Sequence, residues 1–329
     1  MRIHVRAPGR VNLIGDHTDY TGGMVLPMTI DRWTEIRGIP TTAIELHSHD
    51  ESEPAEIDLL IEDPNAVQPS WARYVAGVVA EMAPCVGITG TVVTDIPIGA
   101  GLSSSAALEL AVALALGFEG DALSLAQLCR RAEIRASGVP CGIMDQLVIA
   151  AGMAGHALLI DCGDVTIEPV SIPADVEVVV QFIAQRALVN SAYAKRVAEC
   201  AEAEAEIGPL RSATLGDATA IEDPVVRGRA QHVITENQRV RDFADALNAA
   251  DLHSAGSLMV ASHESLRDRY ETSTPVMDAA VEALNSQRGV FGARMTGGGF
   301  GGCVVALAEP GALHDGWVVN AVDGAHHVE

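Results

Sequence analysis

The chain has 329 residues, which is more than a single hydrophobic core usually serves, so we expect two domains. Lys and Arg number 21 against 44 Asp and Glu, and the formal charge of −23 argues against nucleic acid and anionic membranes as partners. No uncharged apolar run reaches the roughly 18 residues of a membrane span, and no apolar stretch near Met1 resembles a signal peptide. A cytoplasmic protein with six reduced, mostly buried cysteines is therefore predicted.

The first polar cluster follows a short strand predicted at residues 2–7. It combines Arg10 and His17 with the carboxylates of Asp16 and Asp19, between several glycines. An ordinary polar turn also uses Asn, Asp and Gly, but it needs neither the arginine nor the histidine. Alternating carboxylate and imidazole groups offer fixed acceptors and donors to the hydroxyls of a sugar. The pattern predicts a polyol site.

A turn rich in glycine and serine separates a strand predicted at residues 88–96 from a helix predicted at residues 106–116. Before that strand, strands and turns are expected over residues 24–62 and a helix from Trp71 to Met82. The two glycines of the turn can take positive φ, and three serines stand where the helix amides and dipole favour an anion. A triphosphate fits this position. The alternative is a plain joint in which a serine caps the helix.

Two other glycine motifs are excluded. A P-loop requires a lysine, and the only lysine of the chain, Lys195, is far in sequence from any glycine cluster. The run Gly297–Gly302 matches G-x-G-x-x-G, but a strand-like segment follows it where a dinucleotide site needs a helix. Residues 294–303 are instead predicted to form a loop between two strands, which is either a hinge or a backbone that lies close to a ligand.

One further acid and one domain boundary stand out along the chain. The turn at residues 138–146 ends on Asp145, which is either an acid at a helix N-terminus or, near a phosphate loop, a general base. A change in composition around residues 169–173 predicts the boundary between an N-terminal domain, 1–170, and a C-terminal domain, 171–329. The remaining predicted elements are strands at residues 155–162 and 176–183 and helices at residues 124–137, 189–207, 223–247, 255–269 and 276–284.

Several of these stretches resemble one family, the galactokinases, within the GHMP superfamily of small-molecule kinases. Residues 9–20 resemble the galactokinase signature, residues 97–106 the ATP-phosphate motif of GHMP kinases, and residues 294–303 their third motif. Residues 141–146 and 262–270 are also similar to galactokinase. The resemblance implies an α+β protein with the two-domain GHMP kinase fold. Its N-terminal sugar- and ATP-binding domain would be ribosomal-protein-S5-domain-2-like, its C-terminal GHMP kinase domain ferredoxin-like, and its active site would lie in the cleft between them.

The resemblance also implies an enzyme that uses ATP and Mg²⁺ to phosphorylate galactose at the anomeric hydroxyl. Asp145 matches the catalytic base, and Arg10 matches the arginine that lowers the pKa of the hydroxyl and steadies the phosphoryl group. Ser105 and Glu133 match the residues linked to Mg²⁺. Sugar contacts are matched by Asp16, His17, Asp19, Gly142 and Tyr193, and ATP contacts by Gly99, Ala100, Gly101, Leu102, Ser103, Ser104, Ser105 and, near the adenine, Trp71. The expected partners are the sugar and ATP alone, in a monomer or weak homodimer.

One position departs from the family pattern. Most galactokinases have Glu where this chain has Asp16, and the carboxylate that is shorter by about one C–C bond loses a direct hydrogen bond or admits a water. Because the family residue faces the 6-hydroxyl end of the sugar, a galactose relative, a uronic acid or a cyclitol stays open as the substrate. A regulator that binds sugar and ATP without catalysis is a further alternative. Such relatives lose residues of the loop that contains the three serines Ser103 to Ser105. This loop, called the serine loop below, is complete in this chain.

Overall fold

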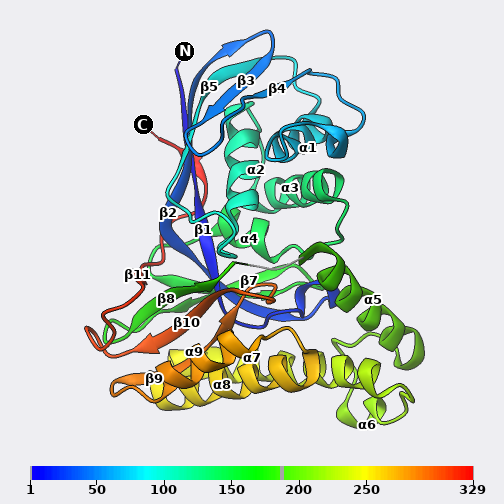
Figure 1. Cartoon of the computed structure of the whole chain (residues 1–329), viewed down its shortest axis with the longest axis vertical. Helices are drawn as coiled ribbons and strands as arrows, with labels where there is room; N and C mark the ends of the chain where they lie inside the picture. Colours follow the sequence, from blue (N-terminus) through cyan, green and yellow to red (C-terminus); the bar gives the residue numbers. More distant parts are fainter. Residues whose placement is uncertain (1, 186–188, 329) are drawn as a thin grey trace.

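The computed structural model describes residues 2–185 and 189–328, which form two β-sheets with helices packed against each. The expected α+β class is confirmed. The helices are α1 (Ala72–Met82), α2 (Ser104–Ala115), α3 (Ala122–Ser137), α4 (Met144–Ala151), α5 (Val189–Ile207), α6 (Leu215–Ala218), α7 (Pro224–Asn248), α8 (Leu252–Ser265) and α9 (Pro275–Asn285). In Figure 1, helices α1 to α4 lie with the first sheet in the upper half, and α7 to α9 lie beneath the second sheet.

The first sheet has eight strands. Its main path is β12 (His326–His327), β1 (Ile3–Ile14), β2 (Met24–Thr41), β5 (Gly87–Thr94), β3 (Ile44–Ser48) and β4 (Ala55–Ile57), while β6 (His156–Asp161) joins β2 to β7 (Thr166–Ser171). Strand β7 was not predicted, because this edge strand contains Pro169 and buries only Val170. Such a strand lacks the alternating pattern by which a half-buried strand is recognised.

The second sheet has four strands, in the order β11 (Trp317–Val319), β8 (Glu177–Ala184), β10 (Gly302–Ala308) and β9 (Val290–Thr296). The loop predicted at residues 294–303 is shorter than expected, since Arg294 to Thr296 pair with Val305 to Cys303. Only residues 297–301 connect the two strands, and glycines 297, 299 and 301 all have positive φ. The glycine run therefore makes one tight reversal.

Strand β1 is much longer than the predicted strand at residues 2–7. It pairs with β2 from Ile3 to Ile14, with register shifts after Pro8 and before Ile14. Its first half alternates between buried and half-buried side chains, whereas every residue from Ala7 to Ile14 is buried. The polar residues Arg10 and Asn12 are therefore strand residues with fixed directions, not members of a flexible turn. Burial on both faces hides the alternation that would have predicted the longer strand.

The end of the described chain returns to the beginning. Val5 and Arg6 of β1 pair with His327 and His326 of β12, and the Arg6 Nε donates to His326 Nε2 at 2.9 Å. The two termini accordingly lie near one another in Figure 1. The first sheet thus contains residues from both ends of the sequence, and the division of the chain at residue 170 stays a prediction.

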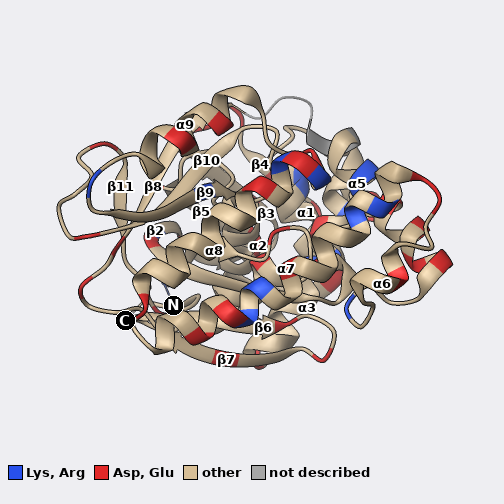
Figure 2. Cartoon of the chain, turned by 90° about the horizontal axis from the view of Figure 1, so that it is seen from below, with Lys and Arg blue, Asp and Glu red and all other residues tan. Residues whose placement is uncertain are grey.

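The surface carries the acidic excess that the composition indicates. In Figure 2, acidic residues are coloured along many of the helices, including α6 and α9. Cys129, Cys200 and Cys303 are buried and Cys85 is exposed, and no cysteine of the described residues is in a disulfide. Within residues 2–185 and 189–328, no helix combines the length and the apolar character that crossing a membrane requires.

Candidate active site

A cavity of about 460 Å³ opens where elements of both sheets meet. The predicted site residues that line it are Arg10, Asp16, His17, Asp19, Trp71, Gly99, Gly101, Ser103, Ser104, Ser105, Glu133, Gly142, Asp145 and Tyr193. Ala100 and Leu102 are also in the predicted loop, but their side chains are buried and do not line the cavity. Strand β1, the first turns of α2 and α4, and the β9–β10 loop thus all contribute residues to the wall of one cavity.

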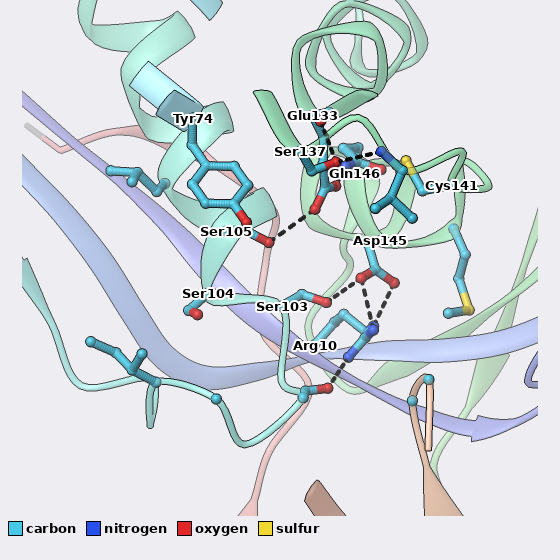
Figure 3. A pocket seen from close by; sticks show the side chains of 18 of the residues that line it. Arg10, Tyr74, Ser103, Ser104, Ser105, Glu133, Ser137, Cys141, Asp145 and Gln146 are labelled. Atoms are coloured by element: carbon cyan, nitrogen blue, oxygen red, sulfur yellow. Dashed lines mark hydrogen bonds and ion pairs between the residues drawn. The ribbon is translucent and has the colours of Figure 1, made fainter. Parts of the chain in front are cut away.

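Arg10 and Asp145 form a two-pronged ion pair in the cavity wall (Figure 3). Arg10 Nε donates to Asp145 Oδ1 and Nη2 to Oδ2, each at 2.7 Å, while Nη1 donates to the Gly101 carbonyl at 2.6 Å. Asp145 lies in the first turn of α4, so it is an acid at a helix N-terminus. Because it also contacts Ser103, it remains the candidate for the predicted general base. Two parallel charge-assisted bonds fix the carboxylate in one orientation.

The start of α2 is left open toward the same cavity. Ser103 precedes the helix at φ 62, and its side chain does not cap the helix; its hydroxyl donates to the Asp145 carboxylate. The prediction of a plain serine cap is therefore wrong. The first-turn amides of an α-helix have no intrahelical acceptor, so this turn offers N–H groups and the positive end of the dipole to an anion.

Two carboxylates, half-buried Glu133 and fully buried Glu109, lie close to Ser105. Ser105 Oγ donates to Glu133 Oε1 at 3.1 Å, and the Gln146 amide nitrogen donates to Glu133 and, at 3.4 Å, to Glu109. Burial, with the nearby charge of Asp145, raises the pKa of Glu133 to about 7. Burial, with the charge of Glu133, raises the pKa of Glu109 well above its ordinary value. Burial and mutual repulsion therefore favour the protonated, neutral forms of both acids in the free protein.

Glu109 and Gln146 were not predicted as site residues, although a pattern in the sequence indicates Glu109. It is the one charged residue of α2, whose other residues are apolar or small, and it follows Ser105 by one helical turn. Residues four apart lie on the same helix face, so an acid at this position must share the environment of the serine loop. Its side chain is 0% exposed.

The predicted sugar residues gather at the other end of the cavity. Burial, with the charge of Asp145, raises the pKa of Asp19 to about 7. A Cβ added to Gly142 would lie 1.8 Å from Asp19 Oδ2, so only glycine permits this approach. The His17 ring lies 5.5 Å from the Tyr193 ring and 4.8 Å from the ring of Tyr270. Carboxylate, imidazole and phenol groups thus surround one small volume, as the resemblance implies.

Asp16 is committed to the protein interior, although it lines the cavity. Its Oδ1 accepts from the Gly297 amide at 2.9 Å, and its Oδ2 lies 2.7 Å from Arg294 Nη2. The carboxylate is 2% exposed, and burial raises its pKa while the Arg294 charge opposes that rise. Arg294 is fully buried and also donates to the Leu13 carbonyl at 3.1 Å. The short acid therefore anchors the β9–β10 glycine loop to the segment that follows β1.

Trp71, which was predicted to lie near the adenine, lines the cavity. Its ring is 8% exposed, and its indole nitrogen donates to the Glu53 carbonyl at 3.1 Å. Tyr74, one turn along α1, was not predicted but also lines the cavity, and Figure 3 shows its ring beside Ser105. Trp71 and Tyr74 together form an aromatic part of the cavity wall, next to the polar part that Ser105 and the acids form.

Three family models match successive parts of the chain. A galactokinase galactose-binding signature matches residues 2–37, the GHMP kinase N-terminal domain matches residues 72–153, and the GHMP kinase C-terminal domain matches residues 243–315. The first match contains Arg10 and the acids of the sugar cluster. The second contains the serine loop, Glu133 and Asp145.

Similar proteins extend over nearly the whole chain. Galactokinase of Bos taurus is 42% identical over 94% of this chain and 84% of its own length, and that of Chloroflexus aurantiacus is 41% identical over 97% and 87%. The crystal structure of Lactococcus lactis galactokinase with galactose superposes with a TM-score of 0.92 at 30% identity, covering 99% of this chain and 95% of that one. Mevalonate kinase of Methanococcus jannaschii, at a TM-score of 0.68, 22% identity and coverage of 94% and 91%, shares the fold.

Asp16→Asn should destabilise the protein strongly. The change removes the carboxylate charge that lies 2.7 Å from fully buried Arg294 and leaves Glu236, at 4.0 Å, as the nearest acid. Breaking one side of a buried ion pair costs about 3–5 kcal/mol, which a lowered thermal midpoint would report. Asp164→Asn, which removes an exposed partner of Arg211, is the control and should change the midpoint little. Equal midpoints for the two variants would contradict the anchoring role of Asp16.

Proposed function

Because the chain belongs to the galactokinase family of GHMP kinases, we propose that its cavity transfers the terminal phosphoryl group of ATP to the anomeric hydroxyl of galactose. The observation that carries this proposal is the position of Asp145. Its carboxylate contacts Ser103 of the phosphate loop, and it shares the cavity with the sugar cluster of His17 and Asp19. A base at the junction of a phosphate site and a polyol site is what phosphoryl transfer to a hydroxyl requires.

In the proposed reaction, Asp145 accepts the proton of the anomeric hydroxyl. The sugar oxygen then forms a bond to the γ-phosphorus while the bond from that phosphorus to the β–γ bridging oxygen breaks, which yields galactose 1-phosphate and ADP. Arg10 holds the carboxylate in place and puts a positive charge beside the transferring group, where transition-state charge accumulates. The open amides at the start of α2 bind phosphate oxygens.

At the sugar end, Asp19 and His17 accept or donate hydrogen bonds to the hydroxyls. Gly142 gives the Asp19 carboxylate its room, and Tyr193 supplies an aromatic face and a phenol. Trp71 and Tyr74 border the position for the adenine. A regulator without catalysis lacks support from this arrangement, because the base, the arginine and the three serines are all present in one cavity.

Ser105 and Glu133 fit a bound Mg²⁺. Their oxygens lie 3.1 Å apart, and burial together with the charge of Asp145 raises the pKa of Glu133 to about 7. Within the described residues, no group of three or more His, Cys, Asp or Glu forms a complete metal cage. Mg²⁺ commonly takes only one or two protein oxygens and fills its other positions with water and phosphate. When bound, the ion neutralises charge on the phosphates.

Asp145→Asn tests the proposed base. The amide keeps an oxygen for Arg10 but cannot take a proton, so kcat should fall by about 10²–10⁴-fold while galactose still binds. A coupled assay of ADP release over galactose, uronic acids, pentoses and cyclitols measures the rate and the substrate class together, and calorimetry measures galactose binding. Turnover within a few-fold of the unchanged protein would remove Asp145 from this role, and no ADP release with galactose would contradict the proposed function.

Ser105→Ala combined with Glu133→Gln tests the metal site. Because both changes remove oxygens proposed to face Mg²⁺, the ion concentration at half-maximal rate should rise by about 10- to 100-fold or the rate should vanish. The rate is titrated against Mg²⁺, and circular dichroism checks that the fold is kept. A normal Mg²⁺ midpoint in a folded variant would exclude this pair as ligands.

Galactose binding should weaken as the pH falls through 7. In the free protein the pKa of Asp19 is about 7, raised above its ordinary value, so the acid is ionised above pH 7 and protonated below it. A protonated acid accepts fewer hydrogen bonds from hydroxyls, so the Kd for galactose should increase about tenfold between pH 8 and pH 6. Calorimetry without nucleotide measures this. Asp19→Asn should bind weakly at every pH, and an unchanged pH profile in that variant would contradict the assignment.

A further inference from the structure

The segment that carries the proposed sugar residues is shaped by contacts inside it and by contacts with another helix. We define the sugar loop as residues 15–24, which contain Asp16, His17 and Asp19. His17 has φ 65, a conformation that non-glycine residues seldom adopt unless their surroundings impose it. Inside the loop, Thr18 Oγ1 donates to the carbonyls of Gly15 and Met24, at 2.9 and 2.7 Å, which brings the two ends together.

Helix α7, from the other end of the sequence, binds the backbone of this loop at three points. His232 Nε2 lies 3.2 Å from the Asp16 carbonyl and donates to it, because a carbonyl oxygen can only accept; burial lowers the pKa of His232 to about 4. Glu236 Oε1 accepts from the Gly15 amide at 3.1 Å, and Asn237 Oδ1 accepts from the Met24 amide at 2.8 Å. His232 and Glu236 are four residues apart and lie on one helix face, and Asn237 follows Glu236 directly.

The three side chains are buried, and two of them have further partners. His232 and Glu236 are 0% exposed and Asn237 is 4% exposed, and none of them lines the cavity. His232 Nδ1 pairs with Ser265 Oγ at 2.9 Å, and Glu236 pairs with Arg239 at 2.7 Å. His232 and Glu236 are therefore held in place by groups other than the loop, as residues that orient another segment must be.

The glycines of the loop match these contacts. A Cβ on Gly23 would lie 2.3 Å from Asn237 Oδ1, and one on Gly15 would lie 2.8 Å from Val240 Cγ2. Both ends of the sugar loop thus lie against α7 with no space for a side chain. The fit is one between a loop backbone and a helix face, and it extends from residue 232 to residue 240.

We propose that His232, Glu236 and Asn237 are positioning residues for the sugar site. They set the conformation of the sugar loop, and so the affinity for sugar, without touching either substrate. The inference rests on the proposed function for the identity of the sugar, but the hold of α7 on the loop is a separate claim. It makes a specific demand: losing one of these contacts should weaken sugar binding and leave nucleotide binding unchanged, because the serine loop has no contact with them.

His232→Leu, His232→Gln and Gln238→Ala separate this role from a general loss of stability. Leucine removes the donor, glutamine keeps an N–H near the position of Nε2, and Gln238 is an exposed residue of the same helix that pairs only with Asp242. Calorimetry gives Kd values for galactose and, separately, for ADP. We expect His232→Leu to raise the galactose Kd by about 5- to 50-fold with ADP unchanged, His232→Gln to recover most of the loss, and Gln238→Ala to match the unchanged protein.

Hydrogen exchange of residues 15–24 gives a readout that needs no ligand. The amides of Gly15 and Met24 should exchange faster in His232→Leu, and in Asn237→Ala if the first variant does not fold, than in Gln238→Ala. Unchanged exchange in a folded variant, or equal losses for galactose and ADP, would overturn the inference. If the unchanged protein does not bind galactose, the proposed function fails, and the exchange result still decides whether α7 holds the loop.

Discussion

The site depends on one buried guanidinium. Arg10 donates to both oxygens of Asp145 and to the Gly101 carbonyl, so a single side chain joins the long strand β1, the start of α4 and the loop before α2. Each of these elements carries a different part of the proposed site: the proposed sugar contacts follow β1, the proposed base lies in the first turn of α4, and the amides proposed to bind phosphate begin α2. Because a guanidinium is planar and always charged, its bonds fix angles as well as distances. The three elements can only be arranged in one way around it.

A second feature follows from the balance of charge around that pair. The protein is strongly acidic overall. Asp19 and Glu133 line the cavity, fully buried Glu109 shares Gln146 with Glu133, and desolvation makes all three carboxylates costly to ionise. Burying such groups destabilises a fold, since each carboxylate prefers water. In the proposed function, sugar hydroxyls would donate to Asp19, and Mg²⁺ would bring positive charge beside Glu133.

Much of the fold and of the candidate site could be predicted from the sequence. The elements and residues that were not predicted were missed for physical reasons. The helix starting at the serines, the acid at the start of α4 and the cluster around His17 all follow local rules of capping, dipoles and polar spacing, and these rules act over a few residues. Strand β1 was cut short because burial on both faces removes alternation. Arg294 and Glu236 went unnoticed because their partners lie in β1 and the sugar loop, more than two hundred residues away. No local pattern announces such a pair; only the folded chain brings its members together.

The pairing of β12 with β1 has a consequence for how the chain is made. Arg6 and His326 are 320 positions apart, so at ribosomal speeds on the order of tens of seconds pass between the synthesis of the two. During that interval the outer edge of β1 is an unpaired strand, the kind of edge that attracts other β-strands. Chains that are still being synthesised on one messenger RNA therefore expose this edge of β1 to one another for a time, whereas in folded chains β12 pairs with it. Strand β12 is only two residues long, yet it pairs with this edge at Val5 and Arg6.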